Sequence, residues 1–145
     1  CGDAGAETDP DTLACKYFSA GPWSDVKGAH AAAGAPDISS ETVAHRITIS
    51  PDPNEPNPDD NEGYVRMTFK EAAKRVFLVN VAVAAELRDA SDKPVAGVDA
   101  CAGGACMSSC GEVRQRLLVT LEAGTYQFYF GPTKVYKLLL THAGL

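Results

Sequence analysis

The chain alternates apolar and polar residues in short segments, and this pattern restricts it to a narrow set of folds. In the first such segment Val43, His45 and Ile47 fall on one parity. Similar segments recur, separated by turn-forming residues, at 64–69, 112–121, 126–130 and 135–141, and residues 75–89 form either one long β segment or two with a bend. Period-two alternation is typical of strands with one buried face. We therefore expect an all-β fold, an antiparallel sandwich or jelly roll of about seven or eight strands.

Composition limits the classes of partner. The chain has 145 residues, 45% of them hydrophobic, and a net charge of −6, which suits one domain with its own core. An acidic surface is repelled by nucleic acid phosphates and by anionic lipid head groups, so we expect no nucleic-acid partner. The longest apolar runs, Val76–Ala85 and Leu117–Leu121, fall short of the ~20 residues of a membrane-spanning helix.

The N-terminal residues resemble the start of a mature bacterial lipoprotein. Cys1 is followed by small and acidic residues in the order GDAGAETDPDTL. The resemblance implies a diacylglycerol anchor on Cys1, a flexible tether over residues 1–14 and a single disulfide-braced domain over residues 15–145. It places the chain in the bacterial cell envelope, facing the periplasm or the outside, with membrane contact only through the lipid. The alternative interpretation is a fragment that happens to start at Cys1.

Cysteine parity agrees with the lipoprotein interpretation. The chain has five cysteines, at positions 1, 15, 101, 106 and 110. Assigning Cys1 to the lipid leaves four thiols, which can form two disulfides in an oxidising compartment. Of the three possible connectivities we favour Cys101–Cys106, which closes a small loop, and Cys15–Cys110, which ties the N-terminal segment to the sandwich.

Three further local predictions concern residues 22–34, 51–63 and 95–98. Pro22, the alanines from Ala29 to Ala33 and a terminal Gly34 indicate a short helix or helical turn. Residues 51–63 carry four prolines and no apolar side chain, so we expect a loop. Val95–Val98 is a candidate short strand.

The C-terminal half resembles the bacterial pre-peptidase C-terminal domains. The residues that carry the likeness are Ala85–Ala90 with Lys93–Val95, then Leu117–Tyr126, then Tyr136–Leu138. Those domains are exported β-sandwiches without catalytic residues, usually appended to secreted enzymes. The cysteine-rich loop and the N-terminal segment depart from that pattern, so the resemblance supports a fold rather than a function.

Sulfur ligands offer one candidate metal site. Cys106, Met107 and Cys110 are soft ligands that suit Cu(I). Such sites usually need a nearby imidazole, and nothing in the sequence fixes the mutual spacing of His30, His45 and His142. His45 lies on the apolar parity of its strand, where a hydrogen-bonded core histidine is the commoner outcome.

Oxygen ligands offer another candidate metal site. Asp52, Asn54, Asp59 and Asp60 lie in the proline-rich loop, and calcium prefers six to eight such oxygens. The loop matches no EF-hand spacing, so a solvated acidic loop is the simpler interpretation.

Aromatic residues allow either a sugar-binding platform or a core. The candidates are Tyr17, Phe18, Trp23, Tyr126, Phe128, Tyr129, Phe130 and Tyr136. The alternation of Tyr126, Phe128 and Phe130 is typical of a core-facing strand. Tyr129 has the opposite parity and is a candidate for exposure.

No catalytic motif is present, since the sequence has neither a Gly-x-Ser-x-Gly elbow nor a phosphate-binding loop. We therefore expect a non-catalytic exported lipoprotein that acts as an interaction or accessory module of a membrane or cell-surface assembly, with a protein partner. Two alternatives stay open: a periplasmic copper-binding protein that uses the Cys/Met loop, and a carbohydrate-binding module.

Overall fold

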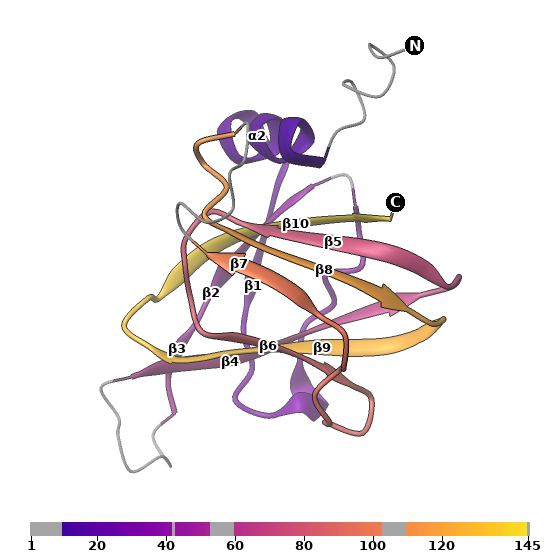
Figure 1. Cartoon of the computed structure of the whole chain (residues 1–145). Coiled ribbons are helices and arrows are strands. Elements are labelled where there is room, and N and C mark those ends of the chain that lie inside the picture. The colour runs from indigo at the N-terminus through magenta and orange to yellow at the C-terminus, as the bar shows by residue number, and fades with distance from the viewer. Residues whose placement is uncertain (1–9, 42, 53–59, 103–109, 145) are drawn as a thin grey trace.

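The alternating segments form ten strands in two β-sheets stacked face to face, and one α-helix lies on the outer face of the larger sheet (Figure 1). This arrangement comes from a computed structural model that describes residues 10–41, 43–52, 60–102 and 110–144. The expected all-β sandwich-like fold is confirmed. The elements of the described part are α2 (Pro10–Ala20), β1 (Trp23–Lys27), a 3₁₀ turn (Ala32–Gly34), β2 (Ala44–Thr48), β3 (Ser50–Pro51), β4 (Asn61–Phe69), β5 (Ala73–Val79), β6 (Ala85–Asp89), β7 (Asp99–Ala102), β8 (Gln115–Leu121), β9 (Gly124–Thr133) and β10 (Lys137–Gly144).

Consecutive strands repeatedly change sheet. The six-stranded sheet has the order β1-β2-β10-β5-β8-β7, and the four-stranded sheet has the order β3-β4-β9-β6. Strand β1 runs parallel to β2, and the other pairs are antiparallel. Of the two alternatives for residues 75–89, the structure shows two strands, β5 and β6, which lie in opposite sheets. Residues 80–84 carry the chain from one sheet to the other.

Aromatic and branched side chains fill the space between the sheets. Phe77 from β5 and Phe128 from β9 meet edge to face, with ring centroids 4.9 Å apart. Phe128 and Phe130 stack at 5.5 Å, and Ile47 and Leu140 close the layer from the larger sheet. This confirms the core-facing parity of β9, because the alternating side chains of one strand face meet those of the opposing sheet.

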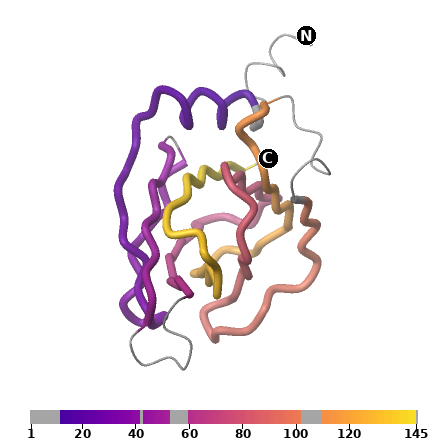
Figure 2. The backbone as a smooth tube through the Cα atoms, turned by 90° about the vertical axis from the view of Figure 1, so that its left-hand side faces the viewer, coloured from indigo at the N-terminus to yellow at the C-terminus, as the bar shows by residue number. Residues whose placement is uncertain are grey.

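Helix α2 covers the outer face of the larger sheet (Figures 1 and 2). Its Ala14 and Phe18 pack on Val76 and Leu78 of β5, in a cluster separate from the main core. Strand β5 is consequently buried on both faces from Arg75 to Val79. A strand covered on both sides loses its alternation and becomes a continuous apolar run, which explains the sequence of this segment.

The helix lies earlier in the chain than the sequence pattern predicts. The expected helix after Pro22 is wrong: Trp23–Lys27 is strand β1, and only Ala32–Gly34 forms a 3₁₀ turn. The actual helix begins at Pro10 and ends before Gly21, which has φ +73° and donates its amide to the Tyr17 carbonyl at 2.9 Å. Proline at the start and a left-handed glycine after the end are the usual helix boundaries.

Two other boundaries differ from expectation. The tether predicted to run to residue 14 is wrong from residue 10 onward, because α2 occupies that stretch and buries Ala14. The short strand predicted at Val95–Val98 is wrong as well. The strand there is β7 at Asp99–Ala102, and Val95 only donates its amide to the Leu87 carbonyl at 2.9 Å.

A disulfide fastens α2 to the body of the fold. Cys15 and Cys110 are bonded, with their Cα atoms 5.7 Å apart, which confirms the predicted pair. Cys101 is also disulfide-bonded, whereas its predicted partner Cys106 lies outside the described residues, as does Cys1. The bridge spans 95 residues of sequence, and a loop of that length constrains the unfolded chain strongly.

We expect the double substitution Cys15→Ala/Cys110→Ala to lower the free energy of unfolding by about 4 kcal/mol, because the loss of a cross-link over a long loop restores entropy to the unfolded chain. Urea titration followed by circular dichroism measures this change. Lys16→Ala, at an exposed position of the same helix, is the control and leaves the midpoint nearly unchanged. Equal midpoints for the double variant and the control would contradict the prediction.

Candidate functional site

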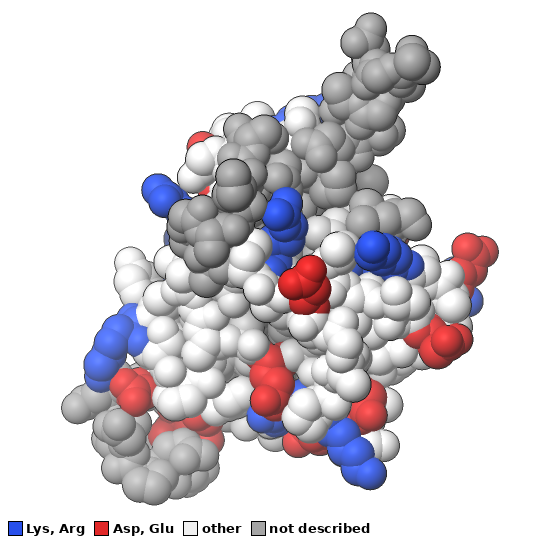
Figure 3. All heavy atoms as spheres, in the orientation of Figure 1, with Lys and Arg blue, Asp and Glu red and all other residues white. Residues whose placement is uncertain are grey.

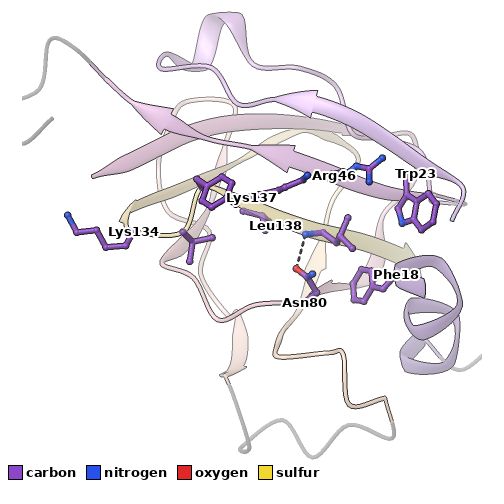
Figure 4. A pocket seen from close by; sticks show the side chains of 10 residues that line it. Phe18, Trp23, Arg46, Asn80, Lys134, Lys137 and Leu138 are labelled. Carbon is purple, nitrogen blue, oxygen red and sulfur yellow. Dashed lines mark hydrogen bonds between the residues drawn. The ribbon is translucent and has the colours of Figure 1, made fainter. Parts of the chain in front are cut away.

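A groove opens beside α2, on the part of the larger sheet that the helix leaves uncovered (Figure 4). It has a volume of about 670 Å³, within the range of small-molecule and oligomer sites. Its floor is formed by β2 and β10, and its walls by the end of α2, the start of β1 and the β9–β10 connection. The lining residues are Phe18, Trp23, Arg46, Asn80, Lys134, Val135, Tyr136, Lys137, Leu138 and Leu139.

Two exposed aromatic rings line this groove. Trp23 is 43% exposed and Tyr136 is 66% exposed, and they are the large hydrophobic side chains that stay exposed in the described part of the chain. Burying them inside the fold would have been favourable, so their shared position in one groove marks a surface that is available to a ligand.

The backbone beside Trp23 holds its ring in place. A Cβ atom at Gly21 would lie 3.0 Å from a ring carbon of Trp23, and the φ of +73° disfavours any other residue there. On β2 the Arg46 guanidinium lies over the ring at 5.4 Å from its centroid, a distance at which a cation–π attraction operates. The ring is therefore positioned before any ligand arrives.

Hydrogen-bond donors dominate the polar part of the groove. Arg46 donates from Nε to Asp25 Oδ1 at 2.5 Å, and this bond lowers the pKa of the Asp25 carboxyl. Lys134 pairs with Asp60 at 2.7 Å. Lys137 is exposed and makes no hydrogen bond among the described residues, and its charge also lowers the pKa of the Asp25 carboxyl. The groove thus presents ammonium and guanidinium groups within a chain of net charge −6.

Asn80 ties the groove floor together. Its side-chain Oδ1 accepts a hydrogen bond from the Leu139 backbone N–H at 2.8 Å, and its backbone N–H donates to the Leu139 carbonyl at 3.1 Å. This pair continues the β5–β10 ladder past Val79, where β5 leaves the sheet. Within the described residues the Nδ2 group of Asn80 has no further partner, so it is a donor that a ligand can use.

A second polar cluster lies inside the sandwich, away from the groove. His45 and His142 are 2% and 1% exposed and stack with ring centroids 5.8 Å apart. His45 donates a hydrogen bond from Nε2 to the Ser40 carbonyl at 2.8 Å, and His142 donates from Nε2 to the Ile38 carbonyl at 2.5 Å. Carbonyl acceptors hold the ring proton on Nε2. The buried Nδ1 atoms of both rings lack a partner in the described structure.

Burial keeps both imidazoles neutral. Desolvation lowers the pKa of His45, and it lowers that of His142 to about 4. Arg75 is 7% exposed and lies over Phe69, with its guanidinium carbon 4.1 Å from the ring centroid; its positive charge further lowers the pKa of His142. Glu41 partly offsets that charge, with Oε1 3.6 Å from Arg75 Nη1. The cluster is a structural element of the core in which protonation is costly.

The structure brings together two of the three histidines. His30 is exposed and shares Nε2 with the Ser50 carbonyl at 3.0 Å, apart from the pair formed by His45 and His142. Among the described residues no three His, Cys, Asp or Glu side chains converge in a way that can hold a metal ion.

The predicted metal ligands are only partly within the described structure. For copper, Cys110 is oxidised in the bridge to Cys15 and is not a thiolate there, whereas Cys106 and Met107 lie outside the described residues. Of the four predicted calcium ligands, Asp52 and Asp60 lie within the described structure, and Asp60 is paired with Lys134. The other two, Asn54 and Asp59, lie outside the described residues.

The smaller sheet carries its polar residues in a closed network. Arg88 lies 4.7 Å from the centroid of Tyr129 and pairs with Glu86 at 2.5 Å and Asp92 at 3.1 Å. The Tyr129 hydroxyl donates to Glu62 at 2.8 Å. Tyr129 is therefore half-buried beneath an arginine and is not an exposed platform.

The face drawn in Figure 3 shows acidic and basic side chains interspersed, without an extended patch of one sign.

Sequence reasoning identified Trp23 and Tyr136 as aromatic candidates but missed the polar residues beside them. Arg46, Asn80 and Lys137 come from three separate strands or strand ends, and their proximity depends on strand order. A usable signal was the pair of lysines that flanks Tyr136 at positions 134 and 137 in an otherwise acidic chain.

The sequence matches no protein-family model, and no curated protein is significantly similar to it. The resemblances to lipoproteins and to pre-peptidase C-terminal domains therefore stay predictions. No helix among the described residues is long and apolar enough to cross a membrane.

We expect stability to fall between pH 6.5 and pH 4 because of His142. In this range the unfolded histidine binds a proton, whereas the folded one, with a pKa of about 4, does not. The free energy of unfolding is lower by about 3 kcal/mol at pH 4 than at neutral pH, because each unit of difference between the folded and unfolded pKa contributes ~1.4 kcal/mol. The measurement is the free energy of urea unfolding at each pH.

The variant His142→Gln removes this contribution, so its stability should depend less steeply on pH than that of the unmodified chain. His30→Gln is the matched control, because His30 is exposed, and it should keep the original slope. Parallel curves for His142→Gln and the unmodified chain would show that His142 does not control the pH dependence.

Proposed function

We propose that this protein is an exported, non-catalytic binding module whose recognition surface is the groove beside α2. The observation that carries the proposal is the placement of both exposed large aromatic side chains, Trp23 and Tyr136, in a single preformed groove. Hydrophobic and aromatic walls with a few oriented polar groups are the common composition of ligand sites.

The chemistry of the lining supports binding. Its polar members are Arg46, Asn80, Lys134, Tyr136 and Lys137. Oriented donors on a rigid sheet bind a ligand without the loss of much side-chain entropy.

Cysteine chemistry supports export. The Cys15–Cys110 bond and the oxidised state of Cys101 belong to an oxidising compartment such as the periplasm or the cell exterior. The acyl anchor on Cys1 is a separate prediction, and the binding proposal does not depend on it.

A carbohydrate is the ligand class that the groove fits best. Sugar rings present C–H groups on one face, which pack on the electron-rich faces of Trp23 and Tyr136, and hydroxyl oxygens at the edge, which accept from Asn80 and Lys137. A protein partner of an envelope assembly is the second candidate. It is favoured by the edge position of β1 next to the groove, because an edge strand can accept another strand.

We expect Trp23→Ala to lower glycan binding at least tenfold while changing the free energy of unfolding by less than about 1 kcal/mol, because this ring is exposed. Binding of the fluorescently labelled protein to a polysaccharide array, together with urea unfolding, measures both quantities. Lys74→Ala, at an exposed position on another strand of the same sheet, is the control. Array binding that is unaffected by Trp23→Ala would exclude the groove.

Intact-mass measurement of the native protein tests export and anchoring together. We expect acyl chains on Cys1 and a loss of four hydrogens for two disulfides, Cys15–Cys110 and Cys101–Cys106. An unmodified Cys1 would reject the anchor but not the binding module, whereas reduced thiols at Cys101 and Cys106 would reject the second disulfide.

A further inference from the structure

We infer that the groove binds an acidic polysaccharide, a chain of uronic acid units whose carboxylates pair with Lys137 and its neighbouring cations. This inference rests on the proposed function, and it adds the charge and the polymeric nature of the ligand. Two observations carry it: the excess of donors over acceptors among the polar side chains of the lining, and the distribution of positive charge along the groove.

The lining supplies donors almost exclusively. Lys137 offers an ammonium group that makes no hydrogen bond among the described residues and only a charge–charge attraction with Asp25, Asn80 offers Nδ2, and Arg46 keeps N–H groups beyond those directed at Asp25. Donors without matching acceptors are satisfied best by ligand oxygens, and charged oxygens form the stronger hydrogen bonds. A carboxylate matches this set better than a neutral hydroxyl does.

Positive charge extends over the length of the groove. Figure 4 shows Lys134 at one end, Lys137 in the middle, and Arg46 beside Trp23 at the other end, where Phe18 also lies. Lys134 and Arg46 are partly neutralised by Asp60 and Asp25. A ligand with one anionic group would use one of these positions, whereas a chain with a charge on every sugar can use several of them.

The aromatic rings favour sugars over other polyanions. Trp23 and Tyr136 lie on the walls of a hollow rather than on a projecting loop, so they suit a chain lying in the groove better than insertion into a bilayer. Single-stranded nucleic acid also stacks on aromatic rings, and the net charge of −6 opposes either polyanion at long range. In a uronic acid the carboxylate is attached to the ring that stacks, so it lies close to Arg46, whose guanidinium lies over Trp23, whereas the phosphate of a nucleotide is separated from its base by the ribose.

The test uses oligogalacturonate of about six units and its fully methyl-esterified form, in which each carboxylate charge is replaced by a neutral methyl ester. Trp23 is the chain's single tryptophan, so its emission reports on the groove directly. We expect the acidic oligomer to change the emission with an affinity at least tenfold above that of the ester. Raising the salt from about 0.05 M to 0.5 M should weaken the acidic oligomer severalfold, because exposed charges are screened.

The variant Lys137→Glu should lower the affinity for the acidic oligomer about tenfold and leave that for the ester within twofold. Lys74→Glu is the matched control: it makes the same charge reversal at an exposed position on strand β5 of the same sheet and should leave both affinities nearly unchanged. Urea unfolding of both variants confirms that each is folded.

Several outcomes would overturn the inference. Equal affinities for the acid and the ester, or array binding confined to neutral glycans, would reject an acidic ligand while leaving the proposed binding module in place. A change in Trp23 emission only with anionic phosphatidylglycerol vesicles or with oligothymidylate would reject a polysaccharide. Failure of every glycan to bind would reject both the inference and the carbohydrate proposal.

Discussion

Helix α2 is held on the six-stranded sheet by the burial of Ala14 and Phe18 and by the bond from Cys15 to Cys110. Much of the remaining structure follows from this contact. It buries the outer side of β5, so Val76 and Leu78 can be as apolar as Phe77 and Val79 on the inner side. A sheet of this size would otherwise expose a broad apolar face, which monomeric proteins avoid.

The same contact creates the groove. The helix covers β5 and parts of β2 and β10, whereas the six-stranded sheet extends further through β2 to the parallel edge strand β1. The uncovered part lies between Phe18 on the helix and the β9–β10 connection (Figure 4). The groove thus has a wall that is covalently fixed and a floor of hydrogen-bonded strands. Such rigidity holds the rings of Trp23 and Tyr136 in place for recognition.

Polar residues inside the sandwich show a different use of burial. His45, His142 and Arg75 lie at one end of the core, where the segment 38–41 supplies carbonyl and carboxylate partners. The main core elsewhere is mostly apolar, with Gln115 as a buried exception that accepts the Val83 amide. Buried polar groups stabilise a fold less than apolar packing does, but they restrict the arrangements in which their hydrogen bonds can be met. The cluster therefore favours one position of segment 38–41 against β10.

Some of the site was visible in the sequence and some was not. The aromatic candidates included Trp23 and Tyr136, but the pattern gave no reason to prefer them to Tyr129, whose parity indicated exposure. In the structure Tyr129 lies under Arg88. Parity predicts which side of a strand a residue occupies, whereas its exposure depends on which cross-strand neighbours lie over it.

The sequence by itself determined the strand content, the sandwich class and the core parity of β2, β4 and β9, because period-two burial is a local property of each strand. It also contained the boundaries of the real helix, Pro10 and Gly21, although Pro22 and Gly34 fit the same pattern of helix boundaries. Tertiary structure decided between the two, because only the earlier segment can place Ala14, Cys15 and Phe18 on the sheet. Strand order likewise decided the groove, since it joins residues from positions 18 to 139 whose proximity depends on long-range pairing that no local pattern encodes.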